Sequence, residues 1–200
     1  MKIFLRIVSL LLCMGIYLSC ASVPVSAIVV NQVPSTIKDI KQEKSNWCWA
    51  ACSEIVGKSV YPSSSVSQSQ IVNKLKGSIG NYLGSINDIM AGCEYAGNYK
   101  KSFTYGDSCY NELLDFSQVG TRIGNGIGVI AAVYVTNNLQ HDVVIAATTF
   151  YDGDGGTTYS IGYIDPIDGK RYYCSFDDFC SGNKEGGARY GRVRVMIYSV

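Results

Sequence analysis

The sequence predicts an α+β domain, with helices in its first half and an antiparallel sheet in its second half. Two observations lead to this class. Helical periodicity and helix-capping residues dominate up to residue 119, whereas short β-branched and aromatic runs bounded by turn residues follow from residue 129. No repeat or linker divides the 200 residues, so one domain is expected. Helices and strands that are segregated along a chain are typical of the α+β class.

The first half is expected to form four helices. The first of them follows Ser45 and Asn46, either of which can cap a helix with its side-chain oxygen. A serine-rich link then leads to the second helix. The expected helical ranges are 47–58, 70–76, 86–95 and 110–119.

The second half is expected to form five strands. The run VIAAVYV is apolar and β-branched, which indicates a buried strand, whereas RVRVMIY alternates like a half-buried strand. The segment YDGDGG is expected to be a loop, because glycine and aspartate favour turns. The expected strand ranges are 129–135, 142–150, 158–165, 170–176 and 192–198.

Residues 1–27 have the features of a signal peptide. Lys2 and Arg6 form a short basic start, an apolar run covers residues 7–18, and small residues end at Ala27, after which we place cleavage. The apolar run is short for a membrane span. We therefore expect a secreted protein whose mature form has no membrane contact.

The mature domain would then cover residues 28–200, and its start up to Lys41 is expected to be an extended lead-in. A lipoprotein anchored at Cys20 is the alternative, although Tyr17-Leu18-Ser19 matches a lipid-attachment box poorly.

The charge pattern excludes several classes of partner. The formal net charge is +1 and no basic or acidic run stands out, so neither nucleic acid nor an anionic membrane is an expected partner. A single histidine and scattered cysteines lack the spacing of a zinc site. The DGDGG segment lacks the closing glutamate of a calcium loop, since Tyr163 occupies that position. We expect no cofactor and no metal, and a monomer.

Disulfides are expected because an exported chain meets oxidising conditions. Proximity in the sequence favours Cys93 with Cys109 and Cys174 with Cys180, although spacing leaves the connectivity open. Cys52 would then stay reduced inside the first helix.

The stretch QEKSNWCWAACSEIVG, residues 42–57, carries the candidate nucleophile. Cys48 lies between Trp47 and Trp49 in the first turn of the expected helix, where unpaired N–H groups and the helix dipole lower the pKa of a thiol. A thiolate is the reactive form of cysteine. The alternative interpretation of Cys48 is a small buried hydrophobe or half of a disulfide.

A thiol nucleophile also needs a base, and His141 is the only histidine in the chain. Asp165 ends the next expected strand, from which a hairpin neighbour can reach and orient the imidazole. Asp142 and Asp168 are alternative orienting groups. Gln42, together with the backbone N–H of Cys48, is expected to hold the oxyanion that forms during acyl transfer.

These segments resemble the papain-like cysteine peptidases. The resemblance rests on Q-x5-C-W, QHDVVIA and YIDPIDG, and it extends from Gln42 to Phe179. It is closer to the compact bacterial branch, which includes double-glycine leader peptidases and effector-type proteases with a WCWAA-like segment. In that family the matching positions act as oxyanion donor (Gln42), nucleophile (Cys48), general base and acid (His141) and orienting carboxylate (Asp165).

The resemblance implies a papain-like fold, in which the nucleophile helix packs on the C-terminal sheet. The sequence departs from papain in two respects: His141 lies only 93 positions after Cys48, and an aspartate replaces the usual asparagine at Asp165. Two further departures concern the family's pattern around the histidine: Gln140 stands where a glycine often precedes it, and the acidic Asp142 follows it. The last two bear on substrate preference.

The expected function is that of a secreted bacterial cysteine endopeptidase that acts on a peptide or protein substrate. Two alternatives stay open. One is a cell-wall peptide amidase or hydrolase with the same thiol chemistry, and the other is a secreted binding or toxin-like module without turnover.

Overall fold

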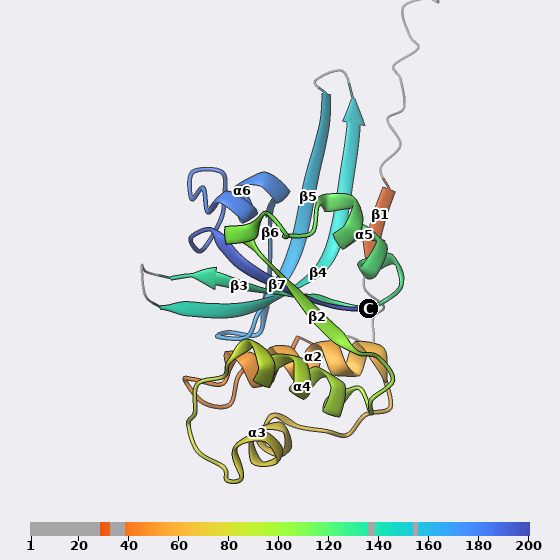
Figure 1. Ribbon diagram of the computed structural model, residues 1–200. Coiled ribbons are helices and arrows are strands. Elements are labelled where there is room, and N and C mark those ends of the chain that lie inside the picture. The colour runs from red at the N-terminus through yellow and green to blue at the C-terminus, as the bar shows by residue number, and fades with distance from the viewer. Residues whose placement is uncertain (1–28, 33–38, 136–138, 154–155) are drawn as a thin grey trace, which may run out of the picture.

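The computed structural model describes residues 29–32, 39–135, 139–153 and 156–200 (Figure 1). The expected signal peptide, residues 1–27, lies outside the described residues, as do two positions of the expected YDGDGG loop. Within the described ranges, no helix is both long and apolar enough to cross a membrane.

The helices of the first half are close to expectation, with one correction. Three of the four expected ranges are confirmed within two residues, but the range 110–119 is wrong, because Asp115 and Gln118 form a capping box that starts the helix at Phe116. A short helix in the second half was not expected. The helices are α2 (Cys48–Val60), α3 (Gln68–Lys76), α4 (Ile86–Ala96), the 3-10 turn η1 (Ser108–Tyr110), α5 (Phe116–Gly124) and α6 (Phe176–Ser181).

Seven strands of the described residues form one antiparallel sheet, which confirms the α+β class. The order is β2-β7-β3-β4-β5-β6, and β1 pairs with the far half of β4. Strand β2 was not expected, since five residues with a glycine give a weak strand pattern. The strands are β1 (Val29–Gln32), β2 (Phe103–Asp107), β3 (Val129–Tyr134), β4 (Gln140–Gly153), β5 (Gly156–Asp165), β6 (Lys170–Ser175) and β7 (Val193–Ser199).

The start of α2 differs from the starts of the neighbouring helices. Helices α3, α4 and α5 each begin with a capping box, whereas the N-cap of α2 is Trp47, which makes no side-chain capping bond to any described residue. The expected caps, Ser45 and Asn46, bind Asn81 instead. The backbone N–H of Asn46 donates to the side-chain oxygen of Asn81, and its side-chain amide donates to the carbonyl of Asn81. The side-chain amide of Asn81 donates to the hydroxyl of Ser45. The first N–H groups of α2 therefore lack the usual cap, and these surround the candidate nucleophile.

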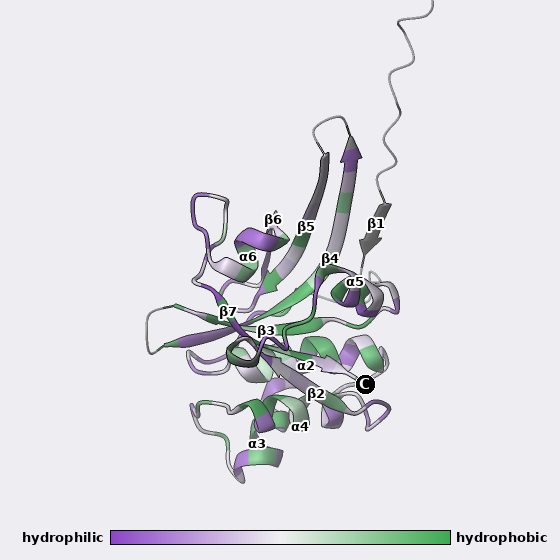
Figure 2. Ribbon diagram, turned by 45° about the horizontal axis from the view of Figure 1, so that its top comes forward, coloured by the Kyte–Doolittle hydropathy of each residue, from purple (hydrophilic) through white to green (hydrophobic). Residues whose placement is uncertain are grey.

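Both faces of the central sheet are covered. Val143 and Val144 on β4 point to opposite faces and are both fully buried. The helices α2, α3 and α4 lie together on one side of the molecule, with α2 against β4, while α5 packs on β4 and α6 on β5 (Figure 1). Figure 2 shows hydrophobic residues along α2 and the middle of the central strands, where the helical part meets the sheet. This junction carries the candidate site.

Helices α2 and α4 approach each other closely at a glycine. A Cβ atom added at Gly57 would lie 2.3 Å from the Cβ of Ala96, well inside van der Waals contact. The contact keeps α2 close to the rest of the helical part and so holds the candidate nucleophile helix in place.

We predict that Gly57→Ala lowers the free energy of unfolding by about 1–3 kcal/mol, because overpacking outweighs the higher helix propensity of alanine. Gly124→Ala is the matched control, since the space around Gly124 in α5 is open. That control is expected to be neutral or to stabilise the protein by up to about 1 kcal/mol. Urea denaturation of both variants measures the difference, and equal effects would contradict the close crossing.

Candidate active site

The two tryptophans fix the start of α2. The indole N–H of Trp47 donates to the carbonyl of Gly80 at 2.8 Å, and that of Trp49 donates to the carbonyl of Tyr82 at 3.0 Å. Both side chains are buried and belong to the hydrophobic core. The segment around residues 80–82 is thereby held against the first turn of α2, and Cys48 is the first residue of that helix.

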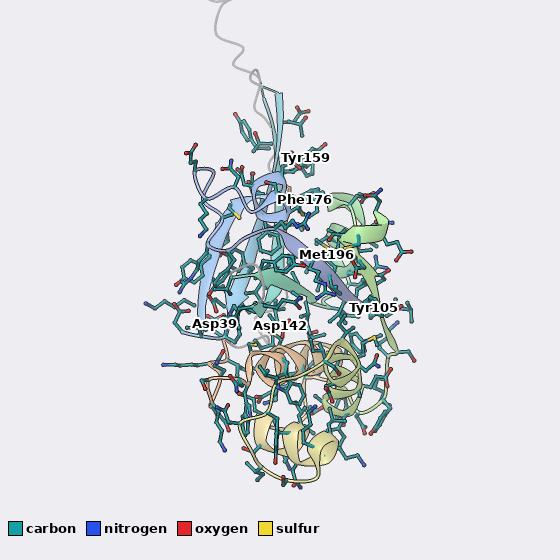
Figure 3. All side chains as sticks on the ribbon, turned by 60° about the vertical axis from the view of Figure 1, so that its left-hand side comes forward. Asp39, Tyr105, Asp142, Tyr159, Phe176 and Met196 are labelled. Atoms are coloured by element: carbon teal, nitrogen blue, oxygen red, sulfur yellow. The ribbon has the colours of Figure 1, made fainter. Side chains whose placement is uncertain are left out.

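Cys48 contacts a carboxylate of β4. Its Sγ lies 3.5 Å from Oδ2 of Asp142, so the thiol donates to the carboxylate. Figure 3 places Asp142 at the junction between the sheet and the helices. Across the described residues no hydrogen bond joins Cys48 to His141, the residue expected as its base. The neighbour of His141 along the strand is therefore the direct partner of the thiol.

This contact reverses the expected electrostatics of Cys48. Burial raises the pKa of the thiol to about 12, and the nearby Asp142 carboxylate acts in the same direction. Backbone N–H groups of Asp142 and Trp49 lower the pKa by less. The expectation of a lowered pKa is thus wrong for this geometry: the helix start is present, but burial outweighs it. Cys48 is a neutral thiol at pH 7 in this arrangement.

His141 and Asp165 form a buried pair across the β4–β5 hairpin. Nε2 of His141 lies 2.8 Å from Oδ1 of Asp165, and the two residues are 5% and 0% exposed. The expected proximity of these residues is therefore present, while their catalytic roles stay a prediction. Because a carboxylate only accepts, Nε2 must carry the proton, which leaves Nδ1 as an acceptor in the neutral ring.

Several groups hold Asp165 in place. It accepts from the hydroxyl of Tyr190 and from the N–H of Ile167 at 3.0 Å, and Arg189 Nε lies 3.3 Å from its Oδ2. Burial alone would raise the pKa of Asp165, but the hydrogen bonds from His141, Tyr190 and Ile167 outweigh it and lower the pKa. Asp165 is therefore an ionised partner for the imidazole at neutral pH.

Sequence reasoning missed Tyr190 and Arg189. They lie on the segment between α6 and β7, and no periodicity or motif links that segment to the β4–β5 hairpin. The guanidinium of Arg189 stacks over Tyr172, 4.4 Å from the ring centroid. The alternative orienting group Asp168 binds Tyr172 and Arg189 in place of His141.

Gln42 braces the loop that leads to Cys48. Its backbone N–H donates to the carbonyl of Pro166 at 2.7 Å, and its amide nitrogen donates to the carbonyls of Lys44 and Ser45, both at 2.9 Å. Its Oε1 is buried and has no partner among the described residues. Both amide hydrogens are thus engaged with the loop rather than aimed at an oxyanion.

Two cavities differ in their relation to these residues. A cavity of about 220 Å³ opens beside Cys48 and Asp142, between α2, α4 and the strands β3 and β4. A larger one of about 710 Å³ lies between α5 and the β4–β5 hairpin. Its lining includes none of the expected site residues. The smaller cavity is therefore the one that serves the candidate site.

The expectation of disulfides is wrong for the described residues. All six described cysteines are free, including Cys93, Cys109, Cys174 and Cys180. Cys93 is buried in α4 whereas Cys109 is exposed on η1, and Cys174 is buried on β6 whereas Cys180 belongs to α6. Cys52 is also fully buried and free, so packing accounts for it. In the parts of the chain that the structure describes, no cluster of three or more potential ligands could hold a metal ion.

Comparison with known proteins supports the fold. No family model and no curated protein sequence matches the chain. Among solved structures, the chain is similar to the crystal structure of SERA5E from Plasmodium falciparum, with a TM-score of 0.53 and 12% sequence identity over 84% of this chain and 91% of that chain. SERA5E has a papain-like fold. At this identity the likeness concerns the fold alone, and the α+β arrangement of this chain is compatible with it.

We predict that Asp142→Asn stabilises the protein in a pH-dependent way. Burial raises the pKa of Asp142 from 3.8 to about 6, so the folded protein holds the proton more tightly than the unfolded chain. Ionised Asp142 therefore destabilises the fold above pH 6, and this penalty vanishes below pH 4. The substituted asparagine cannot ionise, so the gain in unfolding free energy should be about 1–3 kcal/mol at pH 7.5 and much smaller at pH 4.

Urea denaturation at the two pH values provides the measurement. Asp152→Asn is the control, because Asp152 is an exposed carboxylate on the same strand. An Asp142→Asn gain of the same size at both pH values would show that ionisation of this residue does not affect stability.

Proposed function

We propose that this chain is a papain-like cysteine peptidase that hydrolyses peptide bonds with Cys48 as nucleophile, His141 as general base and acid, and Asp165 as the orienting carboxylate. One observation carries the proposal. His141 forms a buried pair with Asp165 of β5, and the residue that follows His141 on β4, Asp142, contacts Cys48 at the uncapped start of α2. A nucleophile, a base and an orienting group thus meet at one junction.

In the proposed mechanism the thiol turns from Asp142 towards His141. This step requires Sγ of Cys48 to leave Asp142 and to come within hydrogen-bond distance of Nδ1 of His141. Nδ1 of His141 then accepts the thiol proton, because Nε2 is occupied by Asp165. This step also offsets the raised pKa of Cys48, since the imidazolium that forms stabilises the thiolate.

The chemistry then follows acyl transfer. The thiolate attacks the peptide carbonyl carbon, and His141 gives its proton to the leaving amine as the C–N bond breaks. A water molecule next loses a proton to His141 and attacks the thioester, which releases the carboxylate product and returns the proton to the thiol. No cofactor is needed for either step.

The oxyanion of each tetrahedral intermediate needs donors. The backbone N–H of Cys48 is the first candidate, because α2 lacks a side-chain cap from any described residue. Gln42 is the second candidate. In this role its side-chain amide must give up its hydrogen bond to the carbonyl of Lys44 or Ser45 and donate to the oxyanion instead. Its position next to the turn that precedes Cys48 supports the assignment.

The substrate and the location of the protein belong to the same proposal. We assign a peptide or protein substrate, a monomer, and export directed by the signal peptide at residues 1–27. The likeness of the fold to SERA5E supports a papain-like frame, while the residues above support its chemistry.

We predict that an epoxysuccinyl probe labels Cys48 in the folded protein faster than it labels Cys109, the exposed thiol on η1. His141→Ala should slow the labelling of Cys48 at least about a hundredfold, because the half-buried thiol then lacks a base. Mass spectrometry of the digested protein measures each site. Preferential labelling of Cys52, or an unchanged rate at Cys48 in His141→Ala, would contradict the proposed pair.

We predict that hydrolysis of fluorescently labelled casein, measured as kcat/KM, falls about 10²- to 10⁴-fold in Asp165→Ala, which removes the group that orients His141. Tyr190→Phe removes one hydrogen bond to Asp165 and should lower kcat/KM about three- to tenfold. Tyr173→Phe is the matched control, because that ring is 67% exposed on β6 and lies apart from the pair. Full activity of Asp165→Ala would contradict an orienting role for this side chain.

A further inference from the structure

The cavity beside Cys48 has the size of one side chain. At about 220 Å³ it is smaller than the sites that enclose whole drug-sized ligands, which start near 300 Å³. Most of its wall is apolar. The apolar side chains come from α2, α4 and the segments that follow α3 and β3, and they are those of Trp49, Leu83, Ile86, Ile89 and Leu139.

The floor of this cavity carries one carboxylate. Asp142 is the charged residue of the lining and is only 9% exposed. Within the described residues it makes no ion pair with a lysine or arginine, and its adjacent His141 is committed to Asp165. Lys76, which lies over the ring of Trp49 at 5.6 Å, is paired with Asp88 at 2.8 Å.

A buried carboxylate without a cationic partner is uncommon, because transfer of an ionised group out of water is costly unless it is paired. Its hydrogen bond comes from the weak S–H donor of Cys48. The site therefore combines an acidic end with an apolar wall. Lysine and arginine match this pattern, since their stems are aliphatic and their ends are cationic.

We infer that Asp142 selects peptide substrates that place a lysine or arginine side chain in the cavity next to Cys48. This inference rests on the proposed function and assigns a substrate class to the same site. The mouth of the cavity suits entry of a long side chain, because Leu83 and Leu139 are 70% and 54% exposed at its rim.

The same contact couples binding to reactivity. A bound ammonium or guanidinium group pairs with the Asp142 carboxylate and offsets its charge, which otherwise opposes the thiolate of Cys48. The carboxylate that holds the thiol in the free protein is thereby occupied by the substrate. Cys48 is released towards His141 when a cationic side chain is in place.

Peptidyl vinyl sulfones test this inference directly. Two sets of three matched tripeptide probes are used, one set for each of the two positions next to the reactive group. Within a set that position carries lysine, norleucine or glutamate, and the other positions carry alanine. Norleucine has the same four-carbon side chain as lysine but lacks the terminal ammonium group. The rate constant for modification of Cys48 is measured by mass spectrometry in the wild-type protein, in Asp142→Asn and in the control Asp152→Asn.

At one of the two positions, the lysine probe should react at Cys48 at least about tenfold faster than the norleucine probe, with the glutamate probe slowest. In Asp142→Asn the ratio of lysine to norleucine should fall to about one, and the norleucine probe should react faster than with the wild-type protein, because the carboxylate that opposes the Cys48 thiolate is gone. Asp152→Asn should keep the wild-type ratio.

The outcomes separate the two proposals. If Cys48 is labelled but the lysine preference is absent in the wild type or persists in Asp142→Asn, the role of Asp142 is overturned while the peptidase assignment stands. If no probe labels Cys48 faster than Cys109, both are overturned. If Asp142→Asn does not fold, the relative rates of the three probes on the wild-type protein still test the inference. The lysine-to-norleucine ratio is then measured in Asp142→Ser instead.

Discussion

The hydrogen bond between His141 and Asp165 is the interaction on which the candidate site depends. It joins two neighbouring strands inside the sheet, and it determines which ring nitrogen is free for chemistry. Asp165 in turn is held by Tyr190, Ile167 and Arg189, which come from a turn and a loop beyond the hairpin. The sheet therefore does more than support α2. The register of β4 and β5, together with the segment between α6 and β7, orients the imidazole of His141.

Adjacent residues of β4 contribute opposing influences. His141 offers a base, whereas Asp142 accepts the proton of the thiol and disfavours its ionisation. The free protein thus keeps Cys48 neutral at neutral pH. An ionised thiol is oxidised more readily than a neutral one, so a carboxylate that yields only to a cationic substrate would limit damage to Cys48. Recognition and activation are then two effects of one side chain.

Much of the framework could be predicted from local patterns. The periodicity of α2, α3 and α4 and the apolar runs of β3 and β4 are local signals, and so is the adjacency of His141 and Asp165 across a hairpin. The contact between Cys48 and Asp142 was outside such reasoning, because it depends on how α2 packs against β4. The same packing buries Cys48, and this burial raises the pKa of its thiol by more than the start of the helix lowers it. Tyr190 reaches Asp165 only through the path of a loop without regular structure.

The most direct test of the central claim uses the fact that the chain contains a single histidine. The imidazole ¹⁵N resonances of His141 are recorded before and after a peptidyl vinyl sulfone modifies Cys48, with alkylation of Cys109 as the control. We expect Nε2 to keep its proton and its hydrogen bond to Asp165, and Nδ1 to shift only on modification of Cys48. An Nδ1 resonance that does not respond to Cys48, or an Nε2 without its proton, would contradict the proposed arrangement.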